Sequence, residues 1–144
     1  MNKKYELLVD DTITFFGRKL FRIKALISFG SVEAGELGGY VAKEGNLSHE
    51  GNARVFDNAE VYGNAEVYGD AWVKSLKDYI VFKNNWSSGR YFTYTKSNKM
   101  WKAGCFYGAG QELINEAYED SENSGKHYEA YVKFVEMLEE LENE

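Results

Sequence analysis

The stretch Val41–Leu76 reads VAKEGN-LSHEGN-ARVFDN-AEVYGN-AEVYGD-AWVKSL, six hexapeptides in succession. The first position of each hexad holds, in order, Val41, Leu47, Ala53, Ala59, Ala65 and Ala71. The third position holds Lys43, His49, Val55, Val61, Val67 and Val73. Gly or Asp fills the fifth position until Ser75, and Asn or Asp fills the sixth until Leu76; these residues tolerate the left-handed backbone of tight turns. The combined periods of two and six predict short strands that share one core, with a turn after every hexad.

This repeat resembles the hexapeptide-repeat proteins, in which three hexads close one coil of a left-handed β-helix. The resemblance implies a short left-handed β-helix of about two coils over residues 41–76. Two coils bury little apolar surface alone, because stacked repeats need about three or more units and capped ends. We therefore expect the flanking segments to close both ends. We also expect a homo-oligomer, a trimer or a multiple of trimers, because hexapeptide β-helices pack side by side in this way.

The segments on either side of the repeat complete a fold that is mainly β with an α+β cap. Residues 1–40 are expected to form an N-terminal β-hairpin cap, because apolar and polar residues alternate on both sides of Gly17-Arg18. The glycine-rich end of this segment, 29–40, is expected to be a loop that leads into the repeat domain, residues 41–76. Residues 77–144 form the third unit, the C-terminal cap.

The C-terminal cap is expected to have the element order β-β-β-α-α. Its strand-like runs are Tyr79–Phe82, Arg90–Lys96 and Met100–Phe106, the last two joined by a hairpin at Ser97-Asn98. A helical pattern opens after the loop Gly108–Gly110 and carries Leu113, Ile114, Ala117 and Tyr118. A second helix after Gly125 places Tyr128, Tyr131, Val132, Val135 and Leu138 on one stripe.

Composition narrows the class of protein. The net charge of −6 argues against general nucleic-acid binding, which needs a basic surface, although it leaves room for a local basic pocket. No segment approaches the length of a membrane span, no signal peptide is apparent, and a single cysteine fits a reducing compartment, so a cytoplasmic protein is expected. The acidic tail 136–144 is interpreted as solvated charge, with partner binding as the alternative.

The candidates for catalysis are His49, Cys105 and His127, and each has a structural interpretation as well. Hexapeptide helices are best known from acyltransferases that use a histidine, but His49 falls where later hexads have valine, which favours a histidine bonded within an end coil. Cys105 precedes a helix and could be a nucleophile with His127 as a distal base, yet no third orienting residue is marked out. We expect a non-enzymatic protein, with neither a metal site nor a cofactor.

Cationic and aromatic residues interleave in the cap, just before its first helix. A cation, an aromatic plate and a helix N-terminus suit a nucleotide-sized ligand, through stacking for the base and positive charge for the phosphate. The predicted ligand-binding residues are Arg90, Phe92, Trp101, Lys102, Gly108 and Gly110. The alternative is an aromatic core beneath the two helices with lysines on the solvent side.

The outward positions of the repeat carry a second aromatic and cationic set. Arg54 and Trp72 are 18 residues apart and should share one face of the coil, and the fourth positions of the same hexads hold Phe56 and Lys74. Residues of this kind are too exposed in a lone helix to have no partner. We expect their burial against other subunits or against the cap.

The run from Leu37 to Val73, followed by NNWSSGRYFTYTKSNKMWKAGCFYGAG at residues 84–110 and two helices, resembles small hexapeptide-repeat proteins encoded by phages and prophages. The resemblance covers nearly the whole chain and implies a small phage accessory protein, a class that often counters host defences. The leading hypothesis is therefore a non-enzymatic, homo-oligomeric binding protein that sequesters a nucleotide-like immune signal or blocks a host effector. The alternatives are an adaptor that binds a partner protein through the β-helix or the acidic tail, and an acyltransferase.

Overall fold

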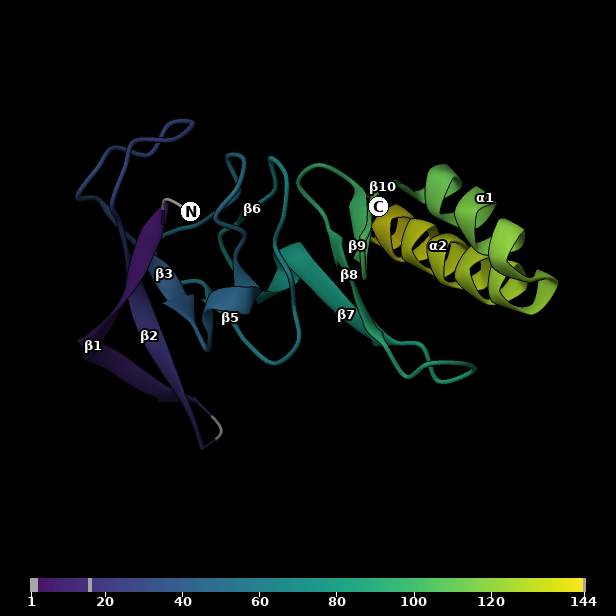
Figure 1. Cartoon of the computed structure of the whole chain (residues 1–144), viewed down its shortest axis with the longest axis horizontal. Helices are drawn as coiled ribbons and strands as arrows, with labels where there is room; N and C mark the ends of the chain where they lie inside the picture. The colour runs from purple at the N-terminus through teal and green to yellow at the C-terminus, as the bar shows by residue number, and fades with distance from the viewer. Residues whose placement is uncertain (1–2, 16, 144) are drawn as a thin grey trace.

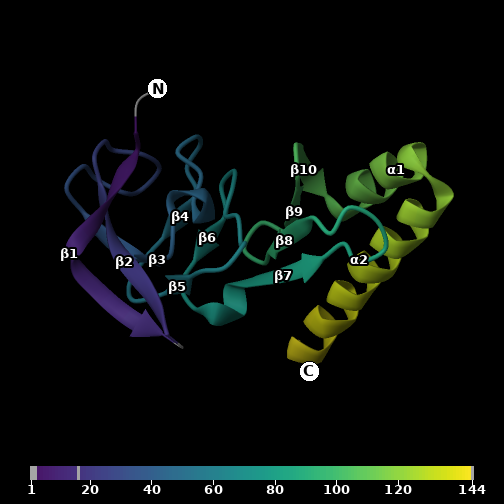
Figure 2. The same ribbon diagram turned by 60° about the horizontal axis from the view of Figure 1, so that its bottom comes forward.

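The computed structural model describes residues 3–15 and 17–143, and it confirms a mainly β fold with a helical segment at the C-terminal end. Its parts follow one another along the long axis of the molecule (Figure 1): an N-terminal hairpin, the repeat segment, a second sheet and two helices. The same order is visible after rotation (Figure 2), where β7 leads from the repeat into the second sheet.

The repeat segment is built of very short parallel strands around a core of small aliphatic residues. Strands β3 (Leu37–Val41) and β5 (Glu60–Val61) pair in parallel, as do β4 (Arg54–Val55) and β6 (Trp72–Val73). The predicted inward positions are at most 4% exposed at Ala53, Val55, Ala59, Val61, Ala65, Val67, Ala71 and Val73. The fifth position has positive φ at Gly51, Asp57, Gly63 and Gly69. The predicted alternation is therefore confirmed from Ala53 to Val73, and the predicted turn positions are confirmed at these four residues.

The register predicted for the first two hexads is wrong. Val41 pairs with Val61, and Leu47 forms a parallel bridge with Val67, so both occupy the third position rather than the first. Lys43 and His49 consequently lie outside the core that the valines fill. Because Leu47 and Val55 are eight residues apart instead of six, the chain between them holds two extra residues. Either assignment gives the first two hexads an aliphatic residue every six positions, so periodicity could not decide between them.

Asn46 fixes the corner that this altered register creates. It ends the short 3-10 helix η1 (Glu44–Asn46) and is fully buried. Its side-chain oxygen accepts hydrogen bonds from the backbone N–H groups of Ala42 and Lys43, both at 3.0 Å. Its amide nitrogen donates to the backbone oxygens of Gly63 (3.2 Å) and Ala65 (2.9 Å) in the next turn. One side chain thus joins two turns of the repeat.

The N-terminal hairpin extends one face of the repeat sideways. Strands β1 (Tyr5–Phe15) and β2 (Arg18–Ala25) are antiparallel, as predicted, and the sheet order is β1-β2-β3-β5. The expected loop 29–40 is wrong at its end, because residues from Leu37 onward form β3. A side chain at Gly38 would lie 2.5 Å from the Val55 oxygen, and one at Gly39 would lie 2.5 Å from the Ala59 oxygen. These glycines allow close packing of the strand rather than forming a loop.

The open end of the first turn is closed by two side chains of the N-terminal segment. Lys4, 1% exposed, donates from its ammonium to the backbone oxygens of Ala53 (2.7 Å) and Gly51 (3.3 Å). The hydroxyl of Tyr5 donates to the Leu47 oxygen at 2.6 Å and has the Glu44 oxygen as an alternative acceptor at 2.8 Å. These contacts satisfy carbonyl groups for which no preceding turn supplies a donor.

The C-terminal sheet has four strands instead of the predicted three, in the order β10-β9-β8-β7. The strands are β7 (Tyr79–Lys83), β8 (Tyr91–Thr95), β9 (Met100–Ala103) and β10 (Phe106–Ala109), and the 3-10 helix η2 (Leu76–Asp78) precedes them. The hairpin at Ser97-Asn98 is confirmed. The run Met100–Phe106 is two strands, because Gly104 has a φ of 59° and reverses the chain.

This sheet closes the second turn of the repeat. The backbone N–H of Glu66 donates to the Thr93 hydroxyl at 3.0 Å, and that of Trp72 donates to the Ser97 hydroxyl at 2.9 Å. The Tyr107 hydroxyl donates to the Tyr68 oxygen at 3.2 Å. Side chains of the cap therefore take the place of a third turn, which explains why two turns suffice.

Two helices cover the other face of the sheet. They are α1 (Gly110–Asp120) and α2 (Glu122–Glu142), so the second helix begins earlier than predicted, after Ser121, whose hydroxyl accepts from the Ser124 N–H. The buried apolar side chains of the helices are Leu113, Ile114, Ala117, Tyr128, Val132 and Val135. Tyr118, expected on the inner face, is 40% exposed and packs over Gly125.

Candidate functional site

The six predicted ligand-binding residues do not line one cavity. Phe92 and Trp101 are 1% and 2% exposed and belong to the aromatic core beneath the helices, with ring centroids 6.1 Å apart. Lys102 lies on the opposite side of the sheet, where its ammonium is 4.6 Å from the Tyr68 ring centroid and 3.8 Å from a Glu66 carboxylate oxygen. Arg90 is exposed immediately before β8 begins at Tyr91.

The predicted glycine loop does not form an open anion site. Gly108 belongs to β10, and Gly110 begins α1, where a Cβ would lie 2.8 Å from a Val132 methyl carbon. Glu112 places its own carboxylate at this helix terminus and accepts from the Ala109 N–H at 3.1 Å. The glycines allow the helices to pack closely, and an acidic side chain already occupies the favourable end of the helix.

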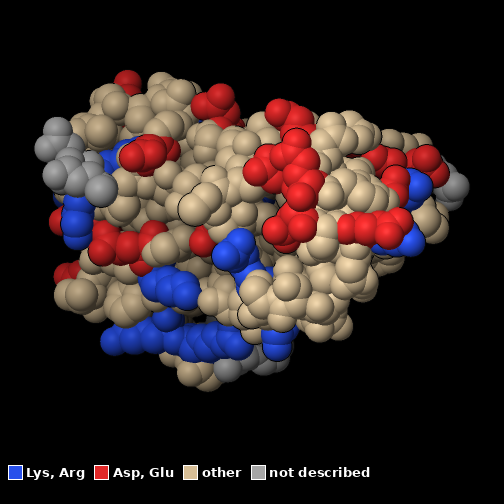
Figure 3. Space-filling view, turned by 45° about the vertical axis from the view of Figure 1, so that its right-hand side comes forward, with Lys and Arg blue, Asp and Glu red and all other residues tan. Residues whose placement is uncertain are grey.

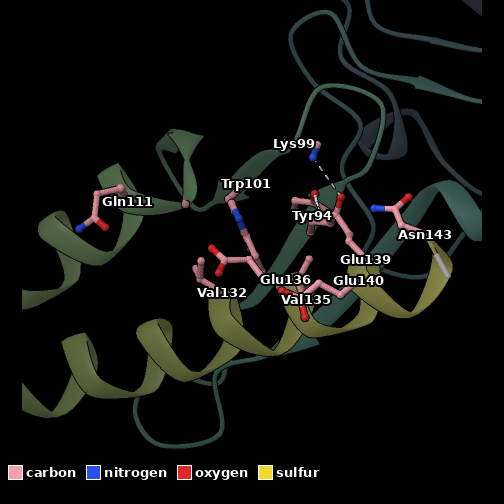
Figure 4. A pocket seen from close by; sticks show the side chains of 11 residues that line it. Tyr94, Lys99, Trp101, Gln111, Val132, Val135, Glu136, Glu139, Glu140 and Asn143 are labelled. Atoms are coloured by element: carbon pink, nitrogen blue, oxygen red, sulfur yellow. Dashed lines mark hydrogen bonds and ion pairs between the residues drawn. The ribbon is translucent and has the colours of Figure 1, made fainter.

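A cleft of about 370 Å³ lies where the N-terminus of α1 meets the C-terminal half of α2 (Figure 4). We call it the Glu139 cleft; its lining consists of Tyr94, Lys99, Trp101, Gly110, Gln111, Val132, Val135, Glu136, Glu139, Glu140 and Asn143. The Tyr94 hydroxyl donates to Glu139, whose other oxygen lies 3.5 Å from the Lys99 ammonium. Burial first, and then the hydrogen bond to Glu139, raise the pKa of Tyr94, so its hydroxyl stays protonated. Three glutamates against one lysine make the cleft unsuited to phosphate.

A second cleft in the cap, of about 630 Å³, lies between the β7–β8 connection, the β9–β10 turn and the two helices. We call it the Asn84 cleft; its lining includes Asn84, Arg90, Cys105, Glu116, Glu119, Asp120 and Tyr128. Asn84 is 6% exposed, and its side-chain oxygen has no hydrogen-bond donor within residues 3–15 and 17–143. A buried acceptor without a donor costs about 1–3 kcal/mol.

The third candidate lies on the outer face of the repeat, on β4 and β6. Arg54 and Trp72 are direct partners in the parallel register, which confirms that they share a face. The Phe56 and Trp72 ring centroids are 6.2 Å apart, the Arg54 guanidinium carbon lies 4.8 Å from the Phe56 centroid, and the Lys74 ammonium lies 5.0 Å from the Trp72 centroid. We call Arg54, Phe56, Trp72 and Lys74 the Trp72 ladder.

The cations of the Trp72 ladder, Arg54 and Lys74, have no carboxylate at salt-bridge distance among the residues that the structure describes. Arg54, Phe56 and Trp72 are half-buried and Lys74 is exposed, so one side of the ladder faces solvent. An adjoining cleft of about 520 Å³ is lined by Arg22, Leu37, Arg54, Phe56 and Asp57 among others. The combination of cations and aromatic plates predicted for the cap is therefore found on the repeat.

Charge is unevenly distributed over the surface. On the face in Figure 3, lysines and arginines form a row along the lower edge, whereas acidic side chains dominate the upper and right-hand parts. The net charge of −6 therefore does not describe each face. A basic patch on one face is compatible with an acidic protein.

Both histidines considered for catalysis are engaged by neighbouring residues, and Cys105 lies in a turn. His49 stacks on Tyr5 with centroids 4.1 Å apart; its Nδ1 accepts from the Lys4 N–H at 3.1 Å, and its Nε2 lies 3.1 Å from Glu44. Cys105 is exposed in the β9–β10 turn, and β10 separates it from α1, so the predicted position next to a helix N-terminus is wrong. His127 stacks on Trp86 at 4.5 Å and is bonded to the Asn123 oxygen at 2.8 Å.

No group of three or more His, Cys, Asp or Glu side chains in the described part of the chain is arranged to hold a metal ion. No helix within the same residues is both long enough and apolar enough to cross a membrane. No protein-family model matches the chain, and no curated protein matches it by sequence. The two clefts of the cap and the Trp72 ladder are therefore the surfaces from which function can be inferred.

Proposed function

We propose that this chain is a non-enzymatic binding protein that captures a nucleotide-like ligand on the Trp72 ladder. The observation that carries the proposal is a pair of cations, Arg54 and Lys74, placed over the rings of Phe56 and Trp72. An aromatic base would stack on the exposed side of the rings, and a phosphate would lie against the cations. Both clefts of the cap are rich in carboxylates, which would repel phosphate.

The proposal includes the winding and assembly of the repeat. We propose that the repeat winds as a left-handed β-helix and that copies of the chain associate side by side, as a trimer or a multiple of trimers. The ladder supports this association because the rings of Phe56 and Trp72 are only half-buried on an outer face of the repeat, so a second copy could cover them. A neighbouring copy would enclose a ligand that a single open face leaves exposed to water.

The biological role proposed for this binding is defence inhibition inside a bacterial host cell. It rests on the resemblance of the repeat and the Trp-Lys-Ala-Gly-Cys-Phe segment, residues 101–106, to small phage-encoded proteins. A protein that holds a nucleotide signal without chemical change needs affinity and enclosure but no catalytic group. The engaged nitrogens of His49 give the acyltransferase alternative little support.

Calorimetric titration with adenine-based and cyclic nucleotides tests the proposal, together with analysis of any ultraviolet-absorbing molecule released when the purified protein is denatured. Trp72→Ala should weaken binding about ten- to a hundredfold, because a stacked base contributes about 1–3 kcal/mol. Arg54→Ala should also weaken it and reduce its salt dependence. Arg90→Ala is the matched control in the cap and should bind normally. No released ligand and no titratable nucleotide, or a loss confined to Arg90→Ala, would exclude the ladder.

A partner protein is the second candidate, because α2 has an apolar stripe that the described part of the chain leaves largely exposed. Phe134, Met137 and Leu141 are 46%, 62% and 63% exposed and recur at helical spacing beside the acidic residues of the tail. A partner that binds this stripe would be lost with Met137→Asp and retained with Trp72→Ala. The opposite pattern would place the partner on the ladder instead.

A further inference from the structure

The Asn84 cleft contains a polar group that is buried, fixed in place and without a donor. The backbone of Asn84 is held on both sides: its N–H donates to the Arg90 oxygen at 2.7 Å, and its oxygen accepts from the Gly89 N–H at 2.8 Å. These two bonds fix the Asn84 backbone in the β7–β8 connection, at the edge of the cleft that the side chain lines. Its oxygen is the one buried side-chain N or O atom without a partner among the described residues.

The other half of the Asn84 amide shows which way the group faces. The Asn84 amide hydrogen-bonds the Tyr128 hydroxyl oxygen, which partly offsets the rise that burial causes in the pKa of Tyr128. With its nitrogen directed at Tyr128, the amide presents its oxygen as a free acceptor. A ligand that satisfies it must bring a hydrogen-bond donor.

The charges around the cleft select the kind of donor. Three carboxylates of α1, Glu116, Glu119 and Asp120, line it opposite a single cation, Arg90. The Arg90 guanidinium packs against Gly104, where a Cβ would lie 2.6 Å from its Nη1, so it sits at the β9–β10 turn at the edge of the cleft. A carbonyl oxygen together with several carboxylates favours a cation with more than one N–H group.

The walls add a shape requirement. Leu113, Ala117 and Phe106 supply apolar surface beside the Tyr128 ring. A planar guanidinium can donate to the Asn84 oxygen and to a carboxylate at once, while its alkyl stem lies on the apolar wall. We propose that the Asn84 cleft is a binding site for a guanidinium-type cation, carried either by a free small molecule such as agmatine or by an arginine side chain of a peptide.

Cys105 provides a direct measurement, because it is exposed, it lines the cleft and it is the only cysteine of the chain. The rate at which a thiol reagent labels the native protein is measured with agmatine, with a short peptide containing one arginine, and with inorganic phosphate at matched ionic strength. Saturable protection by agmatine indicates a free ligand, and protection by the peptide alone indicates an arginine side chain; either supports the site. Absence of protection by both at millimolar concentrations, or equal protection by phosphate, overturns it.

Variants separate binding from folding. Asn84→Leu should abolish protection of Cys105 and change the melting temperature little, because it removes an acceptor that lacks a donor together with the amide that bonds Tyr128. A purely structural Asn84 would instead lower the melting temperature strongly and leave protection intact. Asn84→Asp should tighten binding by adding a carboxylate, which keeps the test decisive if the leucine variant does not fold. Glu116→Gln combined with Asp120→Asn should weaken binding about tenfold, and Glu140→Gln, outside the cleft, should not.

Protection of Cys105 at the wild-type level in Asn84→Leu refutes the assignment. An affinity for the cation that is unchanged in Asn84→Asp refutes it as well. Trp72→Ala should bind the cation normally. Failure of nucleotide capture on the Trp72 ladder and failure of cation binding here are therefore distinguishable.

Discussion

Lys4 couples the stability of the repeat to pH in a way that can be measured. Its ammonium is almost fully buried, donates to backbone oxygens of the first turn and lies 4.3 Å from the Phe29 ring centroid. Burial lowers the pKa of Lys4 from 10.5 to about 8. Between these pH values the unfolded chain keeps a proton that the native chain has released, so the free energy of unfolding should rise with pH.

The magnitude follows from the two pKa values. Each pKa unit corresponds to about 1.4 kcal/mol, so the change from 10.5 to about 8 corresponds to about 3.5 kcal/mol at most. Burial raises the pKa of Tyr5 and of Tyr79, which has the opposite effect, because above pH 10 the unfolded chain loses phenolic protons that the native chain keeps. The contribution of Lys4 should therefore appear as a rise from about pH 8 to about pH 10, followed by a fall.

Urea denaturation of the wild type and of Lys4→Met across this range measures the effect. Met keeps the aliphatic stem and removes the titrating group, so the free energy of unfolding of the wild type relative to Lys4→Met should increase by about 2–3 kcal/mol from pH 7 to pH 10. Lys126→Met, at an exposed position on α2, is the control and should follow the wild type. A rise of equal size in Lys4→Met, or a flat wild-type profile, would refute the reasoning.

Three further substitutions test other contacts by denaturation. Asn46→Ala removes the side chain that joins two turns and should lower the free energy of unfolding by about 2–4 kcal/mol. A free energy of unfolding equal to that of the wild type would contradict the role of Asn46 at the corner. Gly39→Ala places a Cβ 2.5 Å from the Ala59 oxygen and should cost about 1–3 kcal/mol or more; a neutral result would mean that β3 can move away. Tyr94→Phe removes the bond to Glu139 and should cost about 1 kcal/mol, with a late-titrating tyrosine lost from the phenolic absorbance titration.

The fold of the repeat was predictable where the chemistry of each hexad is unambiguous. From Ala53 to Val73 the alternation of alanine and valine admits a single inward set, and the structure buries all of it. In the first two hexads Val41 and Leu47 are compatible with either inward position. Hydrogen bonds of Asn46 to the following turn decide between them, and these depend on residues 17 and 19 positions further along the chain.

The candidate site was predictable in its chemistry and not in its location. The sequence shows cations next to aromatic rings in both the cap and the repeat, but it does not tell which face of a sheet meets the helices. Phe92 and Trp101 become core because two helices require an apolar surface to cover. Arg54 and Lys74 stay available because, within residues 3–15 and 17–143, Arg54 is only half-buried and Lys74 is exposed. The sequence did not indicate Asn84 as a site residue, because asparagine is common in turns and its burial is known only from the structure.

The sequence by itself determined the repeat, its inward alanines and valines, its turn positions and the presence of a hairpin and two helices, because these depend on local conformational preference and on periodic burial. Only the tertiary structure decided how the repeat ends. Lys4 and Tyr5 close one side, Thr93 and Ser97 close the other, and all four satisfy backbone groups that a further turn would have bonded. Such caps join residues that are far apart in the chain, so no local sequence pattern predicts them.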